Sequence, residues 1–228
     1  MEPGNNMRNL KEMSVYLKRS LKFYEMKNET ITPVIFTIVL FISFVGVFIP
    51  RREGMLSAVD IIYNAVSIIV VYLASSVYLI SFIKELKGED FTFAGSIRLV
   101  AGKSFRIIAA TILYLAAVIS GTLLLVVPGI VVYISFLFYN CFLTDAKTGI
   151  IEALKESKNM VKGRKLEIFG LIAMINIILL PLMMITVLTF SGSQIVLSFV
   201  LTFVGAVTNI IQQRLTALIY VDLQYGLH

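Results

Sequence analysis

The sequence has little of the side-chain chemistry on which most enzyme active sites depend. Its 228 residues include one cysteine, Cys141, and one histidine, His228. A single cysteine excludes an internal disulfide, and one cysteine with one histidine cannot form a zinc site of the Cys/His type. A histidine-dependent triad or general base is also excluded, apart from the terminal residue. We therefore expect no metal, no cofactor and no enzymatic activity.

Charged residues are scarce as well, and they leave room for long apolar runs. Charged side chains make up 15% of the chain and hydrophobic ones 58%, whereas soluble domains carry about 25% charged residues. Because such a chain cannot cover its own surface with polar groups, the excess apolar surface must face lipid. The first thirty residues are charged and do not resemble a cleavable signal peptide. The composition predicts an all-α, polytopic membrane helix bundle.

Six apolar runs approach or exceed the length of about 18–20 residues that crosses a hydrocarbon core of about 30 Å. The predicted spans are 31–49, 65–83, 107–127, 130–145, 166–187 and 195–213. Pro128-Gly129 is interpreted as the turn between the third and fourth spans. The fourth run is the shortest, so it is either a short span or the return limb of a hairpin that does not fully cross. Pro181 predicts a kink in the fifth span.

The distribution of lysine and arginine predicts the orientation of these spans. Seventeen of the basic residues lie in three segments: the N-terminal one, the one between spans 2 and 3, and the one between spans 4 and 5. The segments on the opposite side of the membrane hold only two, Arg51 and Arg52. Six spans with both termini in the cytoplasm satisfy this bias. It also accounts for the net charge of +6 without a nucleic-acid partner. Because organelle targeting signals are missing, we expect the plasma membrane of a prokaryote.

Each of the three basic segments contains apolar residues at helical spacing just before a span. They are Leu10, Met13, Leu17, Leu21 and Tyr24 in the first, Phe93, Ile97 and Val100 in the second, and Ile150, Leu154 and Val161 in the third. In the third segment Thr148 is a candidate N-cap and Gly163 a candidate stop. Basic amphipathic helices lie in the membrane interface and favour anionic headgroups. The chain therefore reads as a cytoplasmic amphipathic helix within 1–30 and a six-span domain, 31–228, built from three copies of one unit.

The segment 121–171 resembles a known pattern. An apolar run leads into Pro-Gly, an aspartate follows at the end of the next span, and a helix with the motif "EAL..S..M..G" comes after it. These features are Pro128-Gly129, Asp145, Glu152-Ala153-Leu154, Ser157, Met160 and Gly163, and the closing "ALIYVDL" (217–223) is similar too. With these features the chain resembles the prokaryotic six-helix membrane families grouped with the membrane domain of glycerophosphodiester phosphodiesterases. The resemblance covers about two-thirds of the chain if the order of spans is included.

The resemblance implies a fold more than an activity. In the phosphodiesterase members the hydrolytic domain is a separate soluble barrel that follows the membrane part, and we expect no such domain after His228. The carboxylate and histidine cluster of that chemistry has no counterpart in this sequence, so the catalytic activity does not carry over. Stand-alone members of these families are mostly of unassigned function.

The last span carries small and polar residues on one helical face. They are Ser198, Thr202, Gly205, Asn209 and Gln212, spaced by 4, 3, 4 and 3 positions. Such a face is the usual way in which membrane helices approach and hydrogen-bond one another. The alternative is the polar wall of a cavity for a solute or a lipid headgroup, with Asn64 and Asn176 contributing from other helices.

Three charged residues are predicted at the inner membrane boundary: Arg214, Asp145 and Asp222. If the last span begins at Ile195 on the outer side, Arg214 lies about 29 Å further along the helix axis. Its long stem would then carry the guanidinium to water or lipid phosphate, and a salt bridge to one of the two aspartates is expected to be structural. The alternative is a buried charge in a transport path.

Two functions from different classes follow from these features. The first is a non-catalytic scaffold, accessory or lipid-contacting module, whose partners are membrane lipids with anionic headgroups, another membrane protein or a second copy. The second is a small transporter or channel, favoured by the polar face, by Pro181 and by the threefold unit, because transporter sites often lie at broken helices between repeats. A third alternative, a membrane enzyme that acts on lipid, has the least support.

Overall fold

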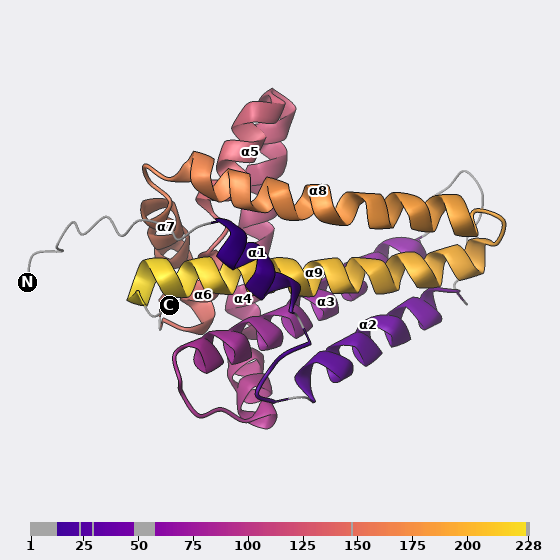
Figure 1. Cartoon of the computed structure of the whole chain (residues 1–228), viewed down its shortest axis with the longest axis horizontal. Helices are drawn as coiled ribbons and strands as arrows, with labels where there is room; N and C mark the ends of the chain where they lie inside the picture. Colours follow the sequence, from indigo (N-terminus) through magenta and orange to yellow (C-terminus); the bar gives the residue numbers. More distant parts are fainter. Residues whose placement is uncertain (1–12, 23, 29, 48–57, 147, 227–228) are drawn as a thin grey trace, which may run out of the picture.

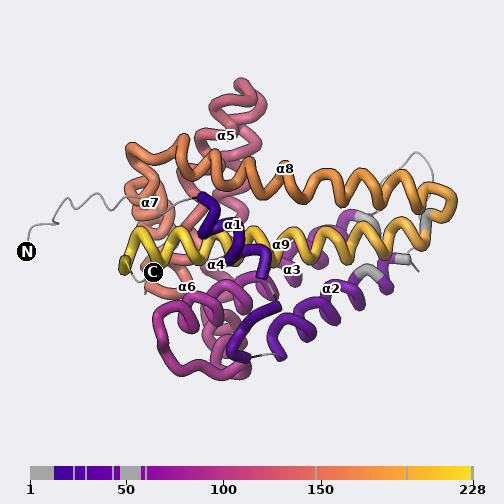
Figure 2. Tube along the Cα trace, in the orientation of Figure 1, coloured from indigo at the N-terminus to yellow at the C-terminus, as the bar shows by residue number. Residues whose placement is uncertain are grey.

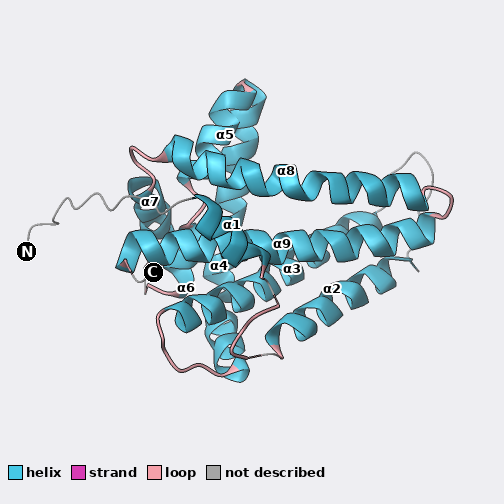
Figure 3. Cartoon of the chain, in the orientation of Figure 1, coloured by secondary structure: helices cyan, strands magenta, loops and turns pink. Residues whose placement is uncertain are grey.

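The computed structural model describes residues 13–22, 24–28, 30–47, 58–146 and 148–226. Within these ranges the chain forms helices and no strand (Figure 3). The helices are α1 (Met13–Leu21), α2 (Ile31–Val47), α3 (Ala58–Leu86), α4 (Phe93–Leu124), α5 (Val126–Ser135), α6 (Tyr139–Thr144), α7 (Ile150–Met160), α8 (Lys165–Phe190) and α9 (Gln194–Tyr225). The predicted all-α class is therefore confirmed.

Five helical segments in the described part of the chain are long and apolar enough to cross a membrane. They are Ile61–Leu86, Phe93–Leu124, Val126–Thr144, Lys165–Phe190 and Ile195–Tyr225. The helix α2 is apolar too, but it is shorter, with 17 residues. Because lipid offers no partner to backbone polar groups, continuous helices are the form in which such runs can cross it. The chain thus has the helices of a multi-pass membrane protein.

The helices run in two directions. Figure 1 and the trace in Figure 2 show α2, α3, α8 and α9 following the long axis of the molecule, whereas α4 and α5 run across it. At one end lie α7 and the end of α9, with α6 nearby, and we call this the α7 end. At the other lies the turn of residues 191–193 between α8 and α9, which we call the turn end. α4 and α5 therefore do not lie parallel to the other long helices, as they would in a simple bundle of antiparallel spans.

The second predicted amphipathic helix is not a separate element. Residues 93–106 and the third apolar run form one helix, α4, of 32 residues. It begins at Thr92, whose side chain accepts a hydrogen bond from the backbone N–H of Gly95 (3.1 Å). No proline interrupts the chain after this cap, and the glycine at position 102 stays helical. The threefold unit of the sequence is therefore not repeated in the structure.

The turn after α4 also differs from the prediction. The chain leaves the helix at Leu125, in an extended conformation, and Pro128-Gly129 lies inside α5. A proline in the first turn of a helix is harmless, because its missing N–H would have no partner in the helix. The fourth apolar run is then broken between Ser135 and Tyr139, where α5 ends and α6 begins.

The third basic segment does form its own helix, α7. Its N-cap is Gly149, one residue after the predicted Thr148, and the Gly149 N–H donates to the Glu152 carboxylate (3.2 Å). Gly163 lies in the turn to α8 with φ +83, a conformation that glycine adopts without strain. α8 then continues through Pro181 without a break.

The buried core lies toward the α7 end. The fully buried side chains of largest volume include Tyr78 and Phe82 of α3, Tyr220 of α9, and Phe138. The Phe142 and Tyr220 rings meet edge to face at 5.2 Å, a favourable geometry for aromatic pairs. Toward the turn end many apolar side chains are exposed. They include Ile177, Leu180, Ile185, Leu188 and Ile195.

Several sequence predictions fall on residues that the structure does not describe. These are the 1–12 part of the predicted N-terminal helix, residues 48–49 of the first span, Arg51 and Arg52, and His228.

Candidate functional site

A polar cavity of about 190 Å³ lies where the crosswise helices meet α3 and α9. Hydrogen-bonding side chains line most of it, and none of its lining residues is charged. The lining residues are Tyr72, Ser75, Leu79, Tyr114, Tyr133, Leu137, Tyr139, Asn140, Asn209, Gln212, Gln213 and Thr216. We call this site the polar cavity. It offers donors and acceptors of hydrogen bonds without a net charge.

Two residues of the predicted polar face reach the polar cavity. Asn209 accepts a hydrogen bond from the Ser75 hydroxyl (2.9 Å), which joins α9 to α3. Gln212 donates to the side-chain oxygen of Asn176 (3.0 Å), which joins α9 to α8. These two residues therefore both line a cavity and make hydrogen bonds between helices.

The other three residues of that face lie outside the cavity. Ser198 is exposed. The Thr202 hydroxyl donates a hydrogen bond to the Ser198 carbonyl of its own helix (2.8 Å). A Cβ atom added at Gly205 would meet nothing within 4 Å. Within the described residues no neighbouring helix approaches closely there, so the absence of a side chain at Gly205 does not serve helix packing inside this chain.

Asn140 is a cavity residue that sequence reasoning missed. Its amide nitrogen donates to the Ser76 hydroxyl (2.9 Å), while its side-chain oxygen is buried without a hydrogen-bond partner in the structure. The residue is only 7% exposed, and a buried acceptor without a partner is uncommon and costs free energy. Its one signal in the sequence was a polar residue inside the run "FLFYNCFL".

Tyrosines of α4, α5 and α6 form one wall of the polar cavity. The hydroxyl groups of Tyr139 and Thr111 share a hydrogen bond of 2.8 Å. The Tyr114 ring packs against those of Tyr133 and Tyr139, with centroids 6.2 and 5.2 Å apart. Their hydroxyl groups can donate hydrogen bonds to, or accept them from, a neutral polar molecule. No acid, amine or imidazole occurs among the lining residues.

Arg214 is buried in the structure and does not reach outward as predicted. It is 6% exposed, and its Nε and Nη1 atoms donate to the backbone carbonyls of Arg19 (2.8 Å) and Glu25 (2.7 Å). Its guanidinium also lies 4.1 Å from the centroid of the Phe82 ring. The reason for the difference is that the last turn of α1 and the segment that joins α1 to α2 each supply one of these carbonyls to the guanidinium.

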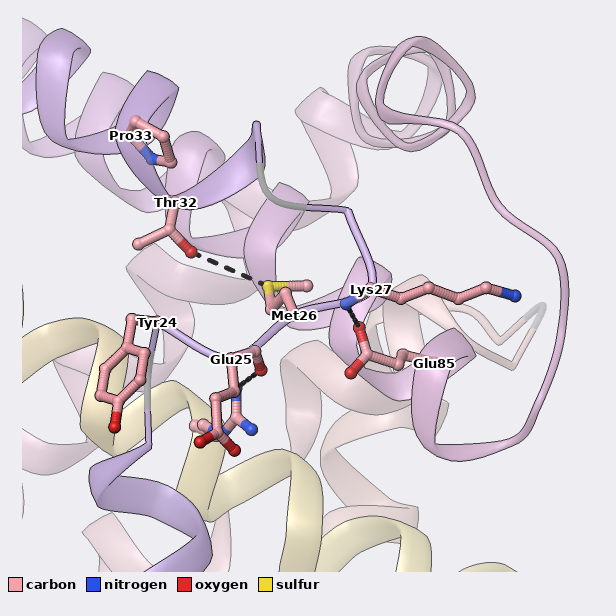
Figure 4. A pocket seen from close by; sticks show the side chains of 8 residues that line it. Tyr24, Glu25, Met26, Lys27, Thr32, Pro33 and Glu85 are labelled. Carbon is pink, nitrogen blue, oxygen red and sulfur yellow. Dashed lines mark hydrogen bonds between the residues drawn. The ribbon is translucent and has the colours of Figure 1, made fainter.

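This segment borders a surface groove of about 840 Å³. Figure 4 shows the residues around it, with the Lys27 backbone N–H donating to the Glu85 carboxylate (2.8 Å). The Thr32 hydroxyl lies 3.9 Å from the Met26 sulfur. The contacts across the groove therefore hold the α1–α2 segment against α3 and α9.

The two predicted aspartates pair with other groups and not with Arg214. Asp145 accepts from Lys87 Nζ (3.0 Å) and from the hydroxyls of Tyr220 (3.1 Å) and Tyr225 (2.5 Å). Asp222 accepts a hydrogen bond from the Tyr16 hydroxyl. The ion pairs found among the described residues include none from Arg214.

Lys87, which directly follows α3, contacts two carboxylates. It lies 2.7 Å from Glu89 as well as 3.0 Å from Asp145. Burial by itself lowers the pKa of Lys87, but the hydrogen bonds to Glu89 and Asp145 outweigh that effect and raise the pKa well above its ordinary value of 10.5. Lys87 is therefore a cation that ties Asp145, at the end of α6, to the end of α3.

A metal site does not emerge from the described residues, where no three histidine, cysteine or carboxylate side chains are grouped so that they could hold an ion. Comparison with known proteins adds no guide to function. No family model matches the chain, and no curated protein and no solved structure is significantly similar to it.

Proposed function

We propose that this chain is a non-catalytic accessory module of a prokaryotic plasma membrane that works by contact with anionic lipid. In this proposal the α7 end and both termini face the cytoplasm. The bias of lysine and arginine toward the segments that flank this end supports the orientation. We also propose that the chain belongs with the six-helix membrane families that segment 121–171 resembles.

The observation that carries the proposal is the position of α7. Its buried face holds Ser157, whose hydroxyl accepts from the Phe138 N–H (3.0 Å) and donates to the Ser135 carbonyl (3.1 Å). The opposite face leaves Lys155 and Lys158 exposed, and Lys162 follows in the next turn, exposed as well. A rigidly held row of lysines at the membrane surface attracts anionic headgroups, at about 1 kcal/mol for each lysine.

Retention of lipid by the purified protein tests this proposal. The protein is extracted from membranes of mixed neutral and anionic lipids, and the lipids that remain bound are counted by native mass spectrometry. Replacing Lys155, Lys158 and Lys162 by glutamine together is expected to lower the ratio of bound anionic to neutral lipid by about tenfold or more.

The matched control replaces the same three lysines by arginine, which keeps the charge, and it is expected to bind lipid as the unchanged protein does. A further control replaces Arg98 and Arg106 by glutamine, because both are exposed on α4. An unchanged ratio in the triple glutamine variant would contradict the proposal.

The polar cavity favours a second candidate, a small transporter for an uncharged solute. Its lining has no charged side chain, and Asn140 presents an acceptor that is otherwise without a partner. Proteoliposomes loaded with a panel of small neutral polyols and amides would show uptake or efflux that Asn140→Leu abolishes. Equal leak from protein-free and protein-containing liposomes would rule out this candidate for the solutes tested.

A further inference from the structure

The hairpin formed by α4 and α5 ends in an uncovered apolar tip. Five consecutive residues there are between 65% and 82% exposed, namely Leu123, Leu124, Leu125, Val126 and Val127. The turn between α8 and α9 has a different character, because it reads Ser191-Gly192-Ser193. Small polar residues are typical of turns in water. The tip of the hairpin has the composition of a surface in contact with hydrocarbon.

The tip is a closely packed structure and not an open loop. A Cβ atom at Gly121 would lie 3.1 Å from Gly129 Cα, and one at Gly129 would lie 2.9 Å from Thr122 Cα. The two arms therefore touch through their backbones directly behind the exposed residues. The apolar side chains are held outward by this contact.

The hairpin meets the rest of the molecule far from the turn end. Tyr114 of α4 and Tyr133 of α5 line the same cavity as Asn209 and Thr216 of α9. These two α9 residues lie about 22 and 33 Å along the helix from Gln194, at 1.5 Å per residue. Since α4 and α5 run across α9, the tip lies to the side of the bundle, beyond α8 (Figure 2). It does not extend toward the turn end.

Charge is confined to the base of the hairpin. No charged side chain occurs from 107 to 144. At the base, Lys103 Nζ of α4 donates to the carbonyls of Leu143 (2.6 Å) and Thr144 (3.1 Å) of α6. The descending and returning arms are therefore fastened at one level, next to the α7 end, and the chain becomes polar on both arms at that level.

We propose that the α4–α5 hairpin enters and leaves the membrane on the side of the α7 end, with its tip among the acyl chains and not in the water beyond. The hairpin then occupies one leaflet, while α2, α3, α8 and α9 cross. This contact with hydrocarbon is separate from the contact between lysines and headgroups. It rests on the membrane placement proposed above, but it does not depend on the lysines of α7 or on which compartment the α7 end faces.

Cysteine accessibility in membranes tests this topology. Cys141, the one cysteine, is fully buried, and Cys141→Ala provides a background without thiols. Leu125→Cys places a thiol at the tip, with Ser191→Cys as the control at the turn end and Lys158→Cys as the control on α7. Right-side-out and inside-out vesicles are treated with a membrane-impermeant maleimide.

The two controls are expected to react from opposite sides. Leu125→Cys is expected to react at least tenfold more slowly than both controls from either side, and at the same rate once detergent and denaturant are added. Reaction from the Ser191 side at the control rate would show that the hairpin crosses. Reaction from the Lys158 side at the control rate would place the tip in water there. Either result overturns the proposal.

A nitroxide spin label at position 125 shows whether lipid or another protein surface covers the tip. High collision with oxygen and low collision with a water-soluble nickel complex is the expected result, as for a lipid-facing site. Low collision with both reagents would mean that a second protein surface covers the tip, and it would overturn the proposal. Val127→Cys, at a residue that is 70% exposed, gives an independent measurement if Leu125→Cys does not fold.

Discussion

Tyr16 of α1 donates a hydrogen bond to the carboxylate of Asp222 in α9, although 206 positions separate the two residues. Both are buried, at 3% and 8% exposure. The contact holds the first described helix against the last one. Together with the two carbonyls that Arg214 binds, it makes the N-terminal segment an integral part of the fold.

Tyr16→Phe is expected to lower the free energy of unfolding by about 1–3 kcal/mol, because it leaves a buried carboxylate without this donor. The measurement is chemical denaturation in detergent micelles. Lys18→Gln, on the exposed side of the same helix, is the control and should change the free energy by less than about 0.5 kcal/mol. Equal effects of the two substitutions would show that the Tyr16–Asp222 bond is not stabilising.

Arg214→Lys is expected to release the α1–α2 segment. The guanidinium binds two carbonyls with Nε and Nη1 and lies over the Phe82 ring, and an ammonium group cannot reproduce this planar arrangement. Limited proteolysis should then cut between residues 19 and 30 at least fivefold faster than in the unchanged protein. Arg98→Lys, at an exposed position, serves as the control, and a proteolysis pattern shared by both variants would contradict the assignment.

Lys87→Met is expected to cost about 3 kcal/mol of stability, because it removes the cation from a nearly buried pair with Asp145. The carboxylates of Glu89 and Asp145 raise the pKa of Lys87 above its ordinary value of 10.5, and the Tyr225 ring lies beside the ammonium, with its centroid 4.7 Å away. A raised pKa in the folded state means that the stabilisation is complete below the ordinary value and is lost as the pH rises through the folded-state value. The difference in unfolding free energy between the two proteins should therefore be constant between about pH 7 and 9 and shrink above pH 10.5. A difference that is already falling between pH 7 and 9 would contradict this assignment.

Ser157→Ala is expected to destabilise the break between α5 and α6 by about 1–3 kcal/mol. The hydroxyl satisfies the Phe138 N–H and the Ser135 carbonyl, and both backbone groups are buried there without a helical partner on that side. Thermal unfolding in detergent measures the loss. Ser193→Ala is the comparison, because the side chain of this N-cap makes no capping hydrogen bond, and it should leave the midpoint unchanged within error.

The positions of some long helices followed from local features. The apolar runs predicted α2, α8 and the start of α9 to within about three residues in the described part of the chain, because run length and composition are properties of the sequence itself. The prediction for α4 and α5 was less accurate, since Pro128 was interpreted as a turn although it lies in the first turn of a helix, where proline is tolerated.

The candidate site was only partly predictable. Helical spacing identified Asn209 and Gln212 together with three residues that do not reach the polar cavity. Asn140 was missed, because a single amide in an apolar run carries no signal of what faces it. The expected partner of Arg214 was a carboxylate, and the structure supplies backbone carbonyls, which no pattern of side chains can predict.

The sequence by itself determined that the chain is helical, that its long helices are apolar enough for a membrane, and that most of its cations lie in three segments. Each of these is set by composition and by spacing along the chain. Only the tertiary structure decided that Asp145 pairs with Lys87, that Arg214 is covered by the α1–α2 segment, and that α4 and α5 run across the other helices. These outcomes depend on which distant surfaces pack together, because an ionic or hydrogen-bonding group takes the partner that packing brings within about 3 Å.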